Sequence, residues 1–359
     1  MSEAELTPVR DAHRFDESAL RAYMADHVDG YGGEPLTIQQ FEGGQSNPTF
    51  LVEAPGGEYV VRKQPPGQLL PSAHQVDREY RVMSALETTD VPVPKMYCLC
   101  EDTGVIGTKF YVMEHVRGRM FMDNLMPSVR REERREIYLD VVRTLARLHN
   151  VNPEAVGLQE FGRPGNYFGR QINRWSRQYA ASETETIEAM NALMEWLPDN
   201  LPDDVRPVIV HGDYRIPNLV MHATEPRVVA ILDWELSTLG DGLADLSYWC
   251  QEFYGDPDGE DLPGADLEEL NIPNEQELID AYCREAGRPA IDNWPFYIAY
   301  NMFRSAGIVQ GVYKRGLDGN ASSEHALEYG AVARERSERG WGIVQAMLRD
   351  LAKTNSIFQ

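Results

Sequence analysis

The sequence has few cysteines, few basic residues relative to acidic ones, and no long apolar run. Among 359 residues, lysine plus arginine number 34 and aspartate plus glutamate number 57, giving a formal net charge of −23 at pH 7. This balance argues against binding to nucleic acid or to an anionic membrane, since both need clustered positive charge. No apolar run approaches the ~18 residues that a membrane span needs. The polar segment Met1 to Leu6 lacks the basic start and apolar core of a signal peptide.

The four cysteines, Cys98, Cys100, Cys250 and Cys283, do not form the pattern of a disulfide framework. Cys98 and Cys100 alternate as in a strand, which points both thiols to one face, and no second pair completes a zinc site. We interpret the four residues as buried, reduced thiols of a cytoplasmic protein.

Two short apolar runs, each followed by polar side chains, organise the rest of the chain. The β-branched run 208–210 predicts a buried strand that leads to Asp213, and Asn218 follows five residues later. A second run, 228–232, delivers Asp233 to the end of another strand. We therefore expect two aspartates and one asparagine to converge.

Phosphoryl transfer from a magnesium-bound nucleotide needs this set of side chains. Asp213 can orient an attacking hydroxyl and accept its proton, while Asn218 and Asp233 supply the hard oxygen ligands that Mg²⁺ prefers. Protein kinases carry the same order, His-x-Asp-x4-Asn and then a strand-borne aspartate, here beginning at His211. The alternative is a simple His-Gly-Asp turn with Asp233 as a helix N-cap. The spacing of Asn218 and the second aspartate favour phosphoryl transfer.

Residues 211–218 (His-Gly-Asp-Tyr-Arg-Ile-Pro-Asn) and 231–235 (Ile-Leu-Asp-Trp-Glu) resemble the signature of the aminoglycoside phosphotransferase family. That family also covers choline, homoserine and related small-molecule kinases. Trp234 stands where protein kinases have the Phe of Asp-Phe-Gly, which separates this branch from them. The resemblance runs from about Phe41 to the early 300s.

The resemblance implies an α+β fold of the two-lobed protein-kinase-like type, and the length suits two lobes of unequal size. We expect a small nucleotide-binding lobe with an antiparallel sheet and one helix over residues 1–114. A hinge over 115–118 would join it to a larger, mainly helical catalytic and acceptor-binding lobe over 119–359.

A Gly-rich turn between two predicted strands, 36–41 and 49–54, suits a loop that covers nucleotide phosphates. Gly43 and Gly44 allow the backbone to approach phosphate oxygens, and the Ser46 hydroxyl can donate to them. A Gly-Gly hairpin is usually only a turn, so the functional interpretation depends on its place ahead of the phosphotransfer motif.

The next predicted strand, 59–63, ends in two candidate phosphate-binding cations. Arg62 and Lys63 cannot face the same side, because side chains alternate along a strand. The family pattern aligns Arg62 with its strand cation, and Lys63 stays an alternative because both residue types bind phosphate. In a helix predicted over 72–86, Glu79 resembles the glutamate that pairs this cation; the alternative is a solvated helix charge.

The strand predicted over 110–114 leads to the point where the lobes would join. Adenine is read there mainly by backbone groups, so we expect the Glu114 carbonyl and the Val116 amide to face the base. His115 is interpreted as a surface or packing residue.

The second half of the chain is predicted to be mainly helical, beginning with an amphipathic helix over 131–150. Asp245 is expected to head or cap a helix, and the acidic, Gly- and Pro-rich stretch 251–275 to form a loop. Tyr300 and Arg304 lie on a later helix whose aromatic stripe is typical of core, although both would also suit an acceptor with anionic groups.

The resemblance implies ATP and Mg²⁺ as cofactors and a small-molecule hydroxyl as acceptor. Residues 44–49, 62–74 and 233–240 look closest to a branch whose members stand alone or precede acyl-CoA dehydrogenase domains. This favours a hydroxyacyl-CoA or similar metabolite as acceptor. An aminoglycoside O-phosphotransferase and a nucleotide-binding pseudokinase scaffold are the alternatives; the complete set Asp213, Asn218 and Asp233 argues against the scaffold.

Overall fold

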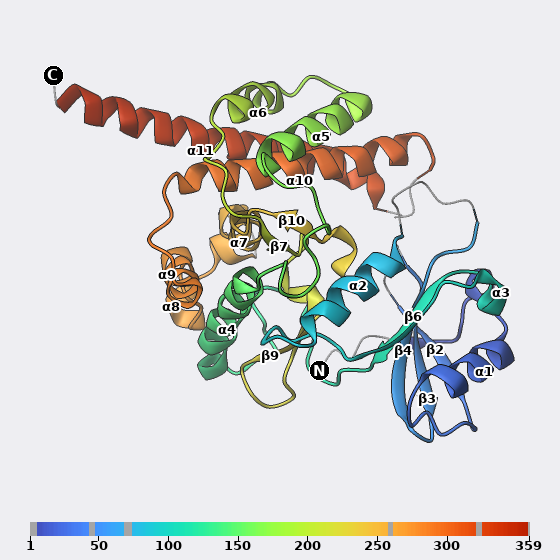
Figure 1. Ribbon diagram of the computed structural model, residues 1–359. Helices are drawn as coiled ribbons and strands as arrows, with labels where there is room; N and C mark the ends of the chain where they lie inside the picture. The colour runs from blue at the N-terminus through green and yellow to red at the C-terminus, as the bar shows by residue number, and fades with distance from the viewer. Residues whose placement is uncertain (1–5, 43–46, 68–73, 258–260, 321–324, 358–359) are drawn as a thin grey trace. The chain divides into compact units, whose positions relative to one another are not determined.

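The computed structural model (Figure 1) describes residues 6–42, 47–67, 74–257, 261–320 and 325–357. The chain divides into two compact units. Unit 1 consists of Met1–Phe161, His211–Thr238 and Glu268–Pro273, and unit 2 of Gly162–Val210, Leu239–Leu267 and Asn274–Gln359. The boundaries of these units differ from those of the expected lobes, which stay a prediction.

The predicted antiparallel sheet is present in unit 1. It has six strands in the order β1-β2-β3-β4-β6-β5, and every neighbouring pair is antiparallel. The strands are β1 (Leu6–Thr7), β2 (Thr37–Phe41), β3 (Thr49–Ala54), β4 (Gly57–Lys63), β5 (Met96–Cys100) and β6 (Phe110–Glu114). Arg62 pairs with Thr49 on one side and Tyr111 on the other, so it lies in a central strand.

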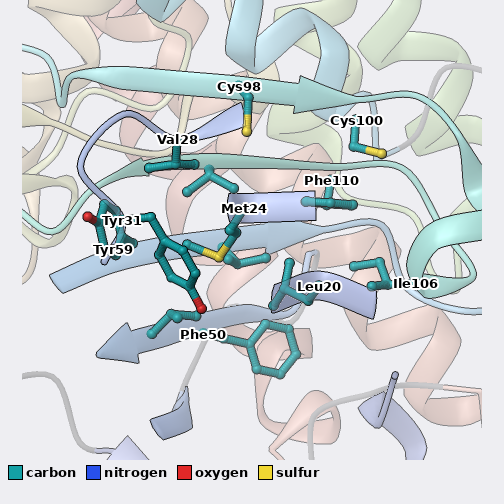
Figure 2. Close-up of a cluster of buried hydrophobic side chains, with 13 residues drawn as sticks. Leu20, Met24, Val28, Tyr31, Phe50, Tyr59, Cys98, Cys100, Ile106 and Phe110 are labelled. Atoms are coloured by element: carbon teal, nitrogen blue, oxygen red, sulfur yellow. The ribbon is translucent and has the colours of Figure 1, made fainter. Parts of the chain in front are cut away.

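One face of the sheet is covered by an apolar cluster (Figure 2). Helix α1 (Glu17–His27) begins at Asp16, whose carboxylate accepts from the Ser18 and Ala19 amides, and it contributes Leu20 and Met24. The remaining members are Val28, Tyr31, Phe50, Val52, Tyr59, Val61, Cys98, Cys100, Ile106, Phe110 and Val112, with Ile106 on the short helix α3 (Thr103–Ile106). Both strand cysteines point into this cluster, as their alternation predicted.

Helix α2 (Val76–Leu86) packs against β5 and β6. Its apolar residues Val76, Val82, Met83 and Leu86 are buried at helical spacing. The expected helix included residues 74 and 75, and this part was wrong, because His74 has a left-handed backbone (φ 57°) and α2 begins at Val76. The expected start at residue 72 lies outside the described residues.

The rest of unit 1 carries the motif residues. Helix α4 spans Arg131–Asn150, as predicted, and accepts a hydrogen bond at the Val141 carbonyl from the Tyr214 hydroxyl (2.8 Å). Strands β8 (Leu219–Met221) and β9 (Val228–Ile231) form a second, two-stranded antiparallel sheet. The 3₁₀ turns η2 (Ile216–Asn218), just before β8, and η3 (Trp234–Leu236), shortly after β9, stand at the same end of this pair.

Unit 2 is mainly helical. Its long helices pack against one another: α5 (Tyr167–Ser182), α6 (Glu188–Asp199), α10 (Trp294–Leu317) and α11 (Tyr329–Ile357). Further elements are β7 (Val208–Val210), β10 (Thr238–Gly240), α7 (Leu243–Cys250) and α9 (Glu275–Ala286). The amide of Asn301 on α10 donates to the Ala244 carbonyl and the Ser247 hydroxyl, and Tyr300 and Arg304 are also buried. The structure therefore favours the core interpretation of this stripe.

Two local expectations need correction. The stretch expected as a loop, 251–275, contains η4 (Gln251–Tyr254), η5 (Leu262–Gly264) and α8 (Leu267–Leu270). Asp245 was expected to head or cap a helix, and it does lie in the first turn of α7; the cap is made by Asp241, whose carboxylate accepts the Leu243 amide (2.9 Å). Within the described ranges, no helix has both the length and the apolarity to cross a bilayer.

Candidate active site

His211 organises the loop that carries Asp213. Its Nε2 lies 2.9 Å from the Leu232 carbonyl, and its Nδ1 accepts the Asp213 amide at 3.2 Å. An Nδ1 acceptor leaves Nε2 to donate to the Leu232 carbonyl, so this histidine ties the Asp213 loop to the residue that follows β9. Its ring also packs against Trp234 with centroids 4.7 Å apart.

Gly212 is required by its surroundings. Its φ is +86°, in the left-handed region that favours glycine, and a Cβ there would lie 2.7 Å from the Leu236 carbonyl oxygen. Any other residue would push the Asp213 loop away from η3.

Asp213 is held by its neighbours in the loop. The Asn218 amide nitrogen donates to the Asp213 carboxylate and carbonyl, both at 2.9 Å. Arg215 Nε lies 3.1 Å from the same carboxylate oxygen. Because the side-chain nitrogen of Asn218 donates to Asp213, the side-chain oxygen, Oδ1, is the atom suited to a cation.

Asp233 lies beside Asn218 through strand pairing. Leu219 pairs with Ile231, and the Leu232 amide donates to the Asn218 carbonyl at 2.8 Å, which brings the next residue, Asp233, to the same end of the hairpin. Its backbone is left-handed (φ 65°, ψ 62°), and its side chain makes no capping hydrogen bond to η3. The N-cap interpretation is therefore not supported.

Arg62 connects this hairpin to the large sheet. Its guanidinium is paired with Glu79 at 2.9 Å and Asp233 at 2.8 Å, and lies 3.9 Å from Glu235. Burial disfavours its charged form, but the surrounding acidic groups, Glu79 foremost, outweigh burial and raise the Arg62 pKa. The predicted pair between a strand cation and Glu79 is thus present with Arg62.

Lys63 points away from that site. Its side chain is buried, and its Nζ lies 5.9 Å from the centroid of the Phe15 ring. Alternation along β4 separates the two cations, as expected. Which of them contacts a nucleotide stays a prediction, and the geometry favours Arg62.

Glu79 has two further partners that sequence reasoning missed. The Asn47 amide donates to it at 2.8 Å and the Tyr111 hydroxyl at 3.1 Å. Burial raises the pKa of the Glu79 carboxyl to about 7, while Arg62 acts in the opposite direction. The position of Asn47 at the end of the Gly-rich segment could have indicated its role from the sequence. The contact of Tyr111 with Glu79 could not have been predicted in this way, because it depends on the pairing of Tyr111 with Arg62 on the neighbouring strand.

The expected adenine-binding residues lie at the end of β6. Glu114 is its last residue and Val116 follows two positions later. His115 Nδ1 and Arg117 Nε lie 2.7 Å and 2.9 Å from the Glu58 carboxylate on β4. Adenine contact by Glu114 and Val116 stays a prediction. Three expected phosphate-loop residues, Gly43, Gly44 and Ser46, lie outside the described residues.

The donor set at the hairpin fits magnesium. Asn218 offers an amide oxygen and Asp233 a carboxylate, and both are the hard oxygen ligands that Mg²⁺ prefers. The Arg62 contact occupies one Asp233 oxygen, Oδ1. The other carboxylate oxygen of Asp233, Oδ2, is not used in this contact with Arg62.

Comparison with known proteins identifies the family to which the chain is similar. The model of the phosphotransferase enzyme family matches residues 37–293. A human protein named acyl-CoA dehydrogenase family member 11 is 45% identical over 345 residues, covering 94% of this chain and 44% of the relative. The chain therefore spans less than half the length of that relative.

Solved structures show the same fold. A Ralstonia eutropha protein described as a candidate aminoglycoside phosphotransferase is 49% identical, with a TM-score of 0.85 and coverage of 93% of this chain and 99% of that one. Aminoglycoside phosphotransferase APH(4)-Ia, solved with ADP and hygromycin B, is 14% identical with a TM-score of 0.58, covering 90% of this chain and 98% of that one. These matches confirm the kinase-like α+β fold, and this chain belongs to the phosphotransferase enzyme family.

Proposed function

We propose that this chain is a small-molecule kinase that transfers the γ-phosphoryl group of ATP to a hydroxyl acceptor. The observation that carries the proposal is the continuous set of contacts from Glu79 through Arg62 to Asp233, beside Asn218 and Asp213. A cation, a metal-ligand pair and a general base are the parts that phosphoryl transfer requires.

Asp213 is the group we assign to the acceptor hydroxyl. Its carboxylate, oriented by Asn218 and Arg215, would accept the hydroxyl proton as the oxygen attacks the γ-phosphorus, while the bond to the bridging oxygen breaks and ADP leaves with its electron pair. General-base catalysis of this kind contributes about 10²–10⁴-fold in rate. The remainder of the acceleration comes from positioning and from charge stabilisation.

Asn218 and Asp233 would hold Mg²⁺, which when bound neutralises charge on the phosphates. Arg62 would contact phosphate oxygens while Glu79 keeps its guanidinium oriented. Solved relatives with ADP support a nucleotide as the second substrate.

The described cysteines are all unpaired, which agrees with the proposed cytoplasmic location.

The acceptor that we propose is a hydroxyacyl-CoA or a similar hydroxylated metabolite. The support is the 45% identity to a protein named as an acyl-CoA dehydrogenase family member, over 94% of this chain. An aminoglycoside is the second candidate, favoured by the description of the Ralstonia eutropha relative.

The test is a phosphorylation screen with Mg-ATP and a pool of hydroxyacyl-CoAs, aminoglycosides, choline and sugars. Products are identified by mass spectrometry, with Asp213→Ala as the inactive control and AMP-PNP binding measured by calorimetry for both proteins. We expect a phosphorylated acyl-CoA from the wild type alone, and AMP-PNP binding by both.

Each other result has a defined meaning. A phosphorylated aminoglycoside without acyl-CoA product would replace the proposed acceptor. AMP-PNP binding with no product from the pool would favour the pseudokinase scaffold. Absence of both binding and product would refute the kinase proposal.

A further inference from the structure

Arg78 stands directly before Glu79 on α2 and makes contacts of its own. Its Nη2 donates to the Phe161 carbonyl at 2.8 Å and to the Ser237 carbonyl at 3.3 Å. Its guanidinium carbon lies 4.1 Å from the centroid of the Phe161 ring, a cation–π contact. All four residues belong to unit 1.

Ser237 is rigidly connected to Asp233. Its amide and hydroxyl both bond to the Trp234 carbonyl, at 3.0 Å and 2.6 Å, and close the turn η3 that begins after Asp233. Ser237 is buried, and α2 packs against η3. The carbonyl that Arg78 grips is therefore fixed relative to the metal-ligand candidate.

Two consecutive residues of α2 therefore position the two partners of the Arg62–Asp233 ion pair. Glu79 pairs with Arg62, and Arg62 reaches Asp233. Arg78 donates a hydrogen bond to Ser237, which lies in the segment 233–237 that begins with Asp233. A shift of α2 would move Glu79 and its guanidinium partner away from Asp233, and a misplacement of 1 Å can cost about 10²-fold in rate.

We propose that Arg78 is a positioning residue that fastens α2 to the segment 233–237 and so holds Arg62 in register with Asp233. The inference depends on the proposed function, since it assigns Arg78 a part in aligning the phosphate-binding cation with the metal site. A planar guanidinium can donate to two carbonyls while its face stacks on an aromatic ring, whereas a tetrahedral ammonium has no flat face to stack.

Arg81 provides the matched control. It lies on the same helix, one turn further on, and its Nη2 donates to the Gly157 carbonyl at 3.1 Å. It therefore ties α2 to the chain ahead of Phe161 through one hydrogen bond, at an exposed position. The Arg81→Ala variant therefore loses an arginine from α2 but keeps the hydrogen bond from Arg78 to Ser237.

The experiment compares Arg78→Ala, Arg78→Lys and Arg81→Ala in the full chain. The readouts are ADP formation from Mg-ATP with the acceptor pool, and AMP-PNP affinity as a function of Mg²⁺ concentration. We expect both Arg78 variants to lower kcat at least tenfold and to raise the half-saturating Mg²⁺ concentration several-fold. Arg81→Ala should stay within twofold of the wild type in both.

A double-mutant cycle separates alignment from simple destabilisation. If Arg78 acts through Glu79, Arg78→Ala combined with Glu79→Gln should be no more than twofold slower than Glu79→Gln alone. Independent, multiplying losses would overturn the proposal, as would an Arg78→Ala variant that matches Arg81→Ala. Failure of the wild type to bind AMP-PNP or form ADP would instead refute the proposed function.

Discussion

The two sides of strand β4 in the large sheet are built differently, although both are buried. On one side, Val61 joins the apolar cluster with α1, and the Lys63 ammonium lies near the Phe15 ring. On the other, Arg62 and Glu79 form a buried ion pair with polar neighbours. Buried charges are costly and gain little over an apolar core. The charged side is therefore expected to serve binding, and the apolar side stability.

The largest effect on stability alone should come from Phe50→Ala. Phe50 is fully buried in the apolar cluster, and truncating a buried phenylalanine costs about 3–5 kcal/mol of unfolding free energy. Urea denaturation measures this loss. AMP-PNP affinity, measured by calorimetry at a temperature where the variant is folded, should stay within about twofold of the wild type. A larger loss of affinity would contradict the division between the two sides.

Arg62→Met should lower both the stability of the fold and the affinity for AMP-PNP. It leaves Glu79 buried without its cation, and breaking a buried pair costs about 3–5 kcal/mol, less whatever Glu79 recovers by protonation. Nucleotide affinity should fall as well. Lys63→Met is the control, because it removes the neighbouring cation from a site whose Nζ faces an aromatic ring. Equal losses in the two variants, by urea denaturation and AMP-PNP calorimetry, would show that the ion pair carries no special weight.

Asn47→Ala should have an intermediate effect. The Asn47 amide donates to Glu79, and loss of that donor leaves a buried carboxylate oxygen short of one hydrogen bond, at a cost of about 1–3 kcal/mol. The variant should also weaken AMP-PNP binding, because Asn47 joins the end of the Gly-rich segment to Glu79. Unchanged stability and affinity in the same two assays would remove Asn47 from the site.

The smallest effect should be the pH-dependent stability that Glu58 contributes. Hydrogen bonds from Arg117 and His115 hold the pKa of the Glu58 carboxyl down at about 2, below its ordinary value of 4.5. A depressed pKa stabilises the native state above pH 4.5, and this stability is lost as pH falls toward 2. The side chain is partly exposed, so the contribution is under about 1 kcal/mol. The stability gap between wild type and Glu58→Gln should therefore narrow between pH 7 and pH 3 in urea denaturation.

Local patterns predicted several of the contacts that the structure shows at the candidate site. The spacing of Asn218 after Asp213 and the apolar run before Asp233 express local structure, and strand alternation separated Arg62 from Lys63. Asn47 and Tyr111 were missed because their contacts with Glu79 depend on how strands and helix come together. A single sequence gives no direct measure of that pairing.

Helix boundaries and caps were predicted less well, for the same reason. The start of α2 depends on the backbone of His74, and the cap of α7 on which of Asp241 and Asp245 reaches the first amides. Both residues fit the cap by type, so only the folded geometry distinguishes them. The short helices in 251–275 were hidden by an acidic, Gly- and Pro-rich composition that usually indicates a loop.

The left-handed backbone at Asp233 also limits how this chain could change during evolution. Asparagine and glycine accept such a conformation readily, whereas β-branched or bulky residues are strained there. A change to asparagine would remove the carboxylate with little disturbance of the turn. Loss of activity could then occur in one step while the fold persists. Descendants that have abandoned catalysis for a binding role should carry asparagine or glycine at this position more often than any other replacement.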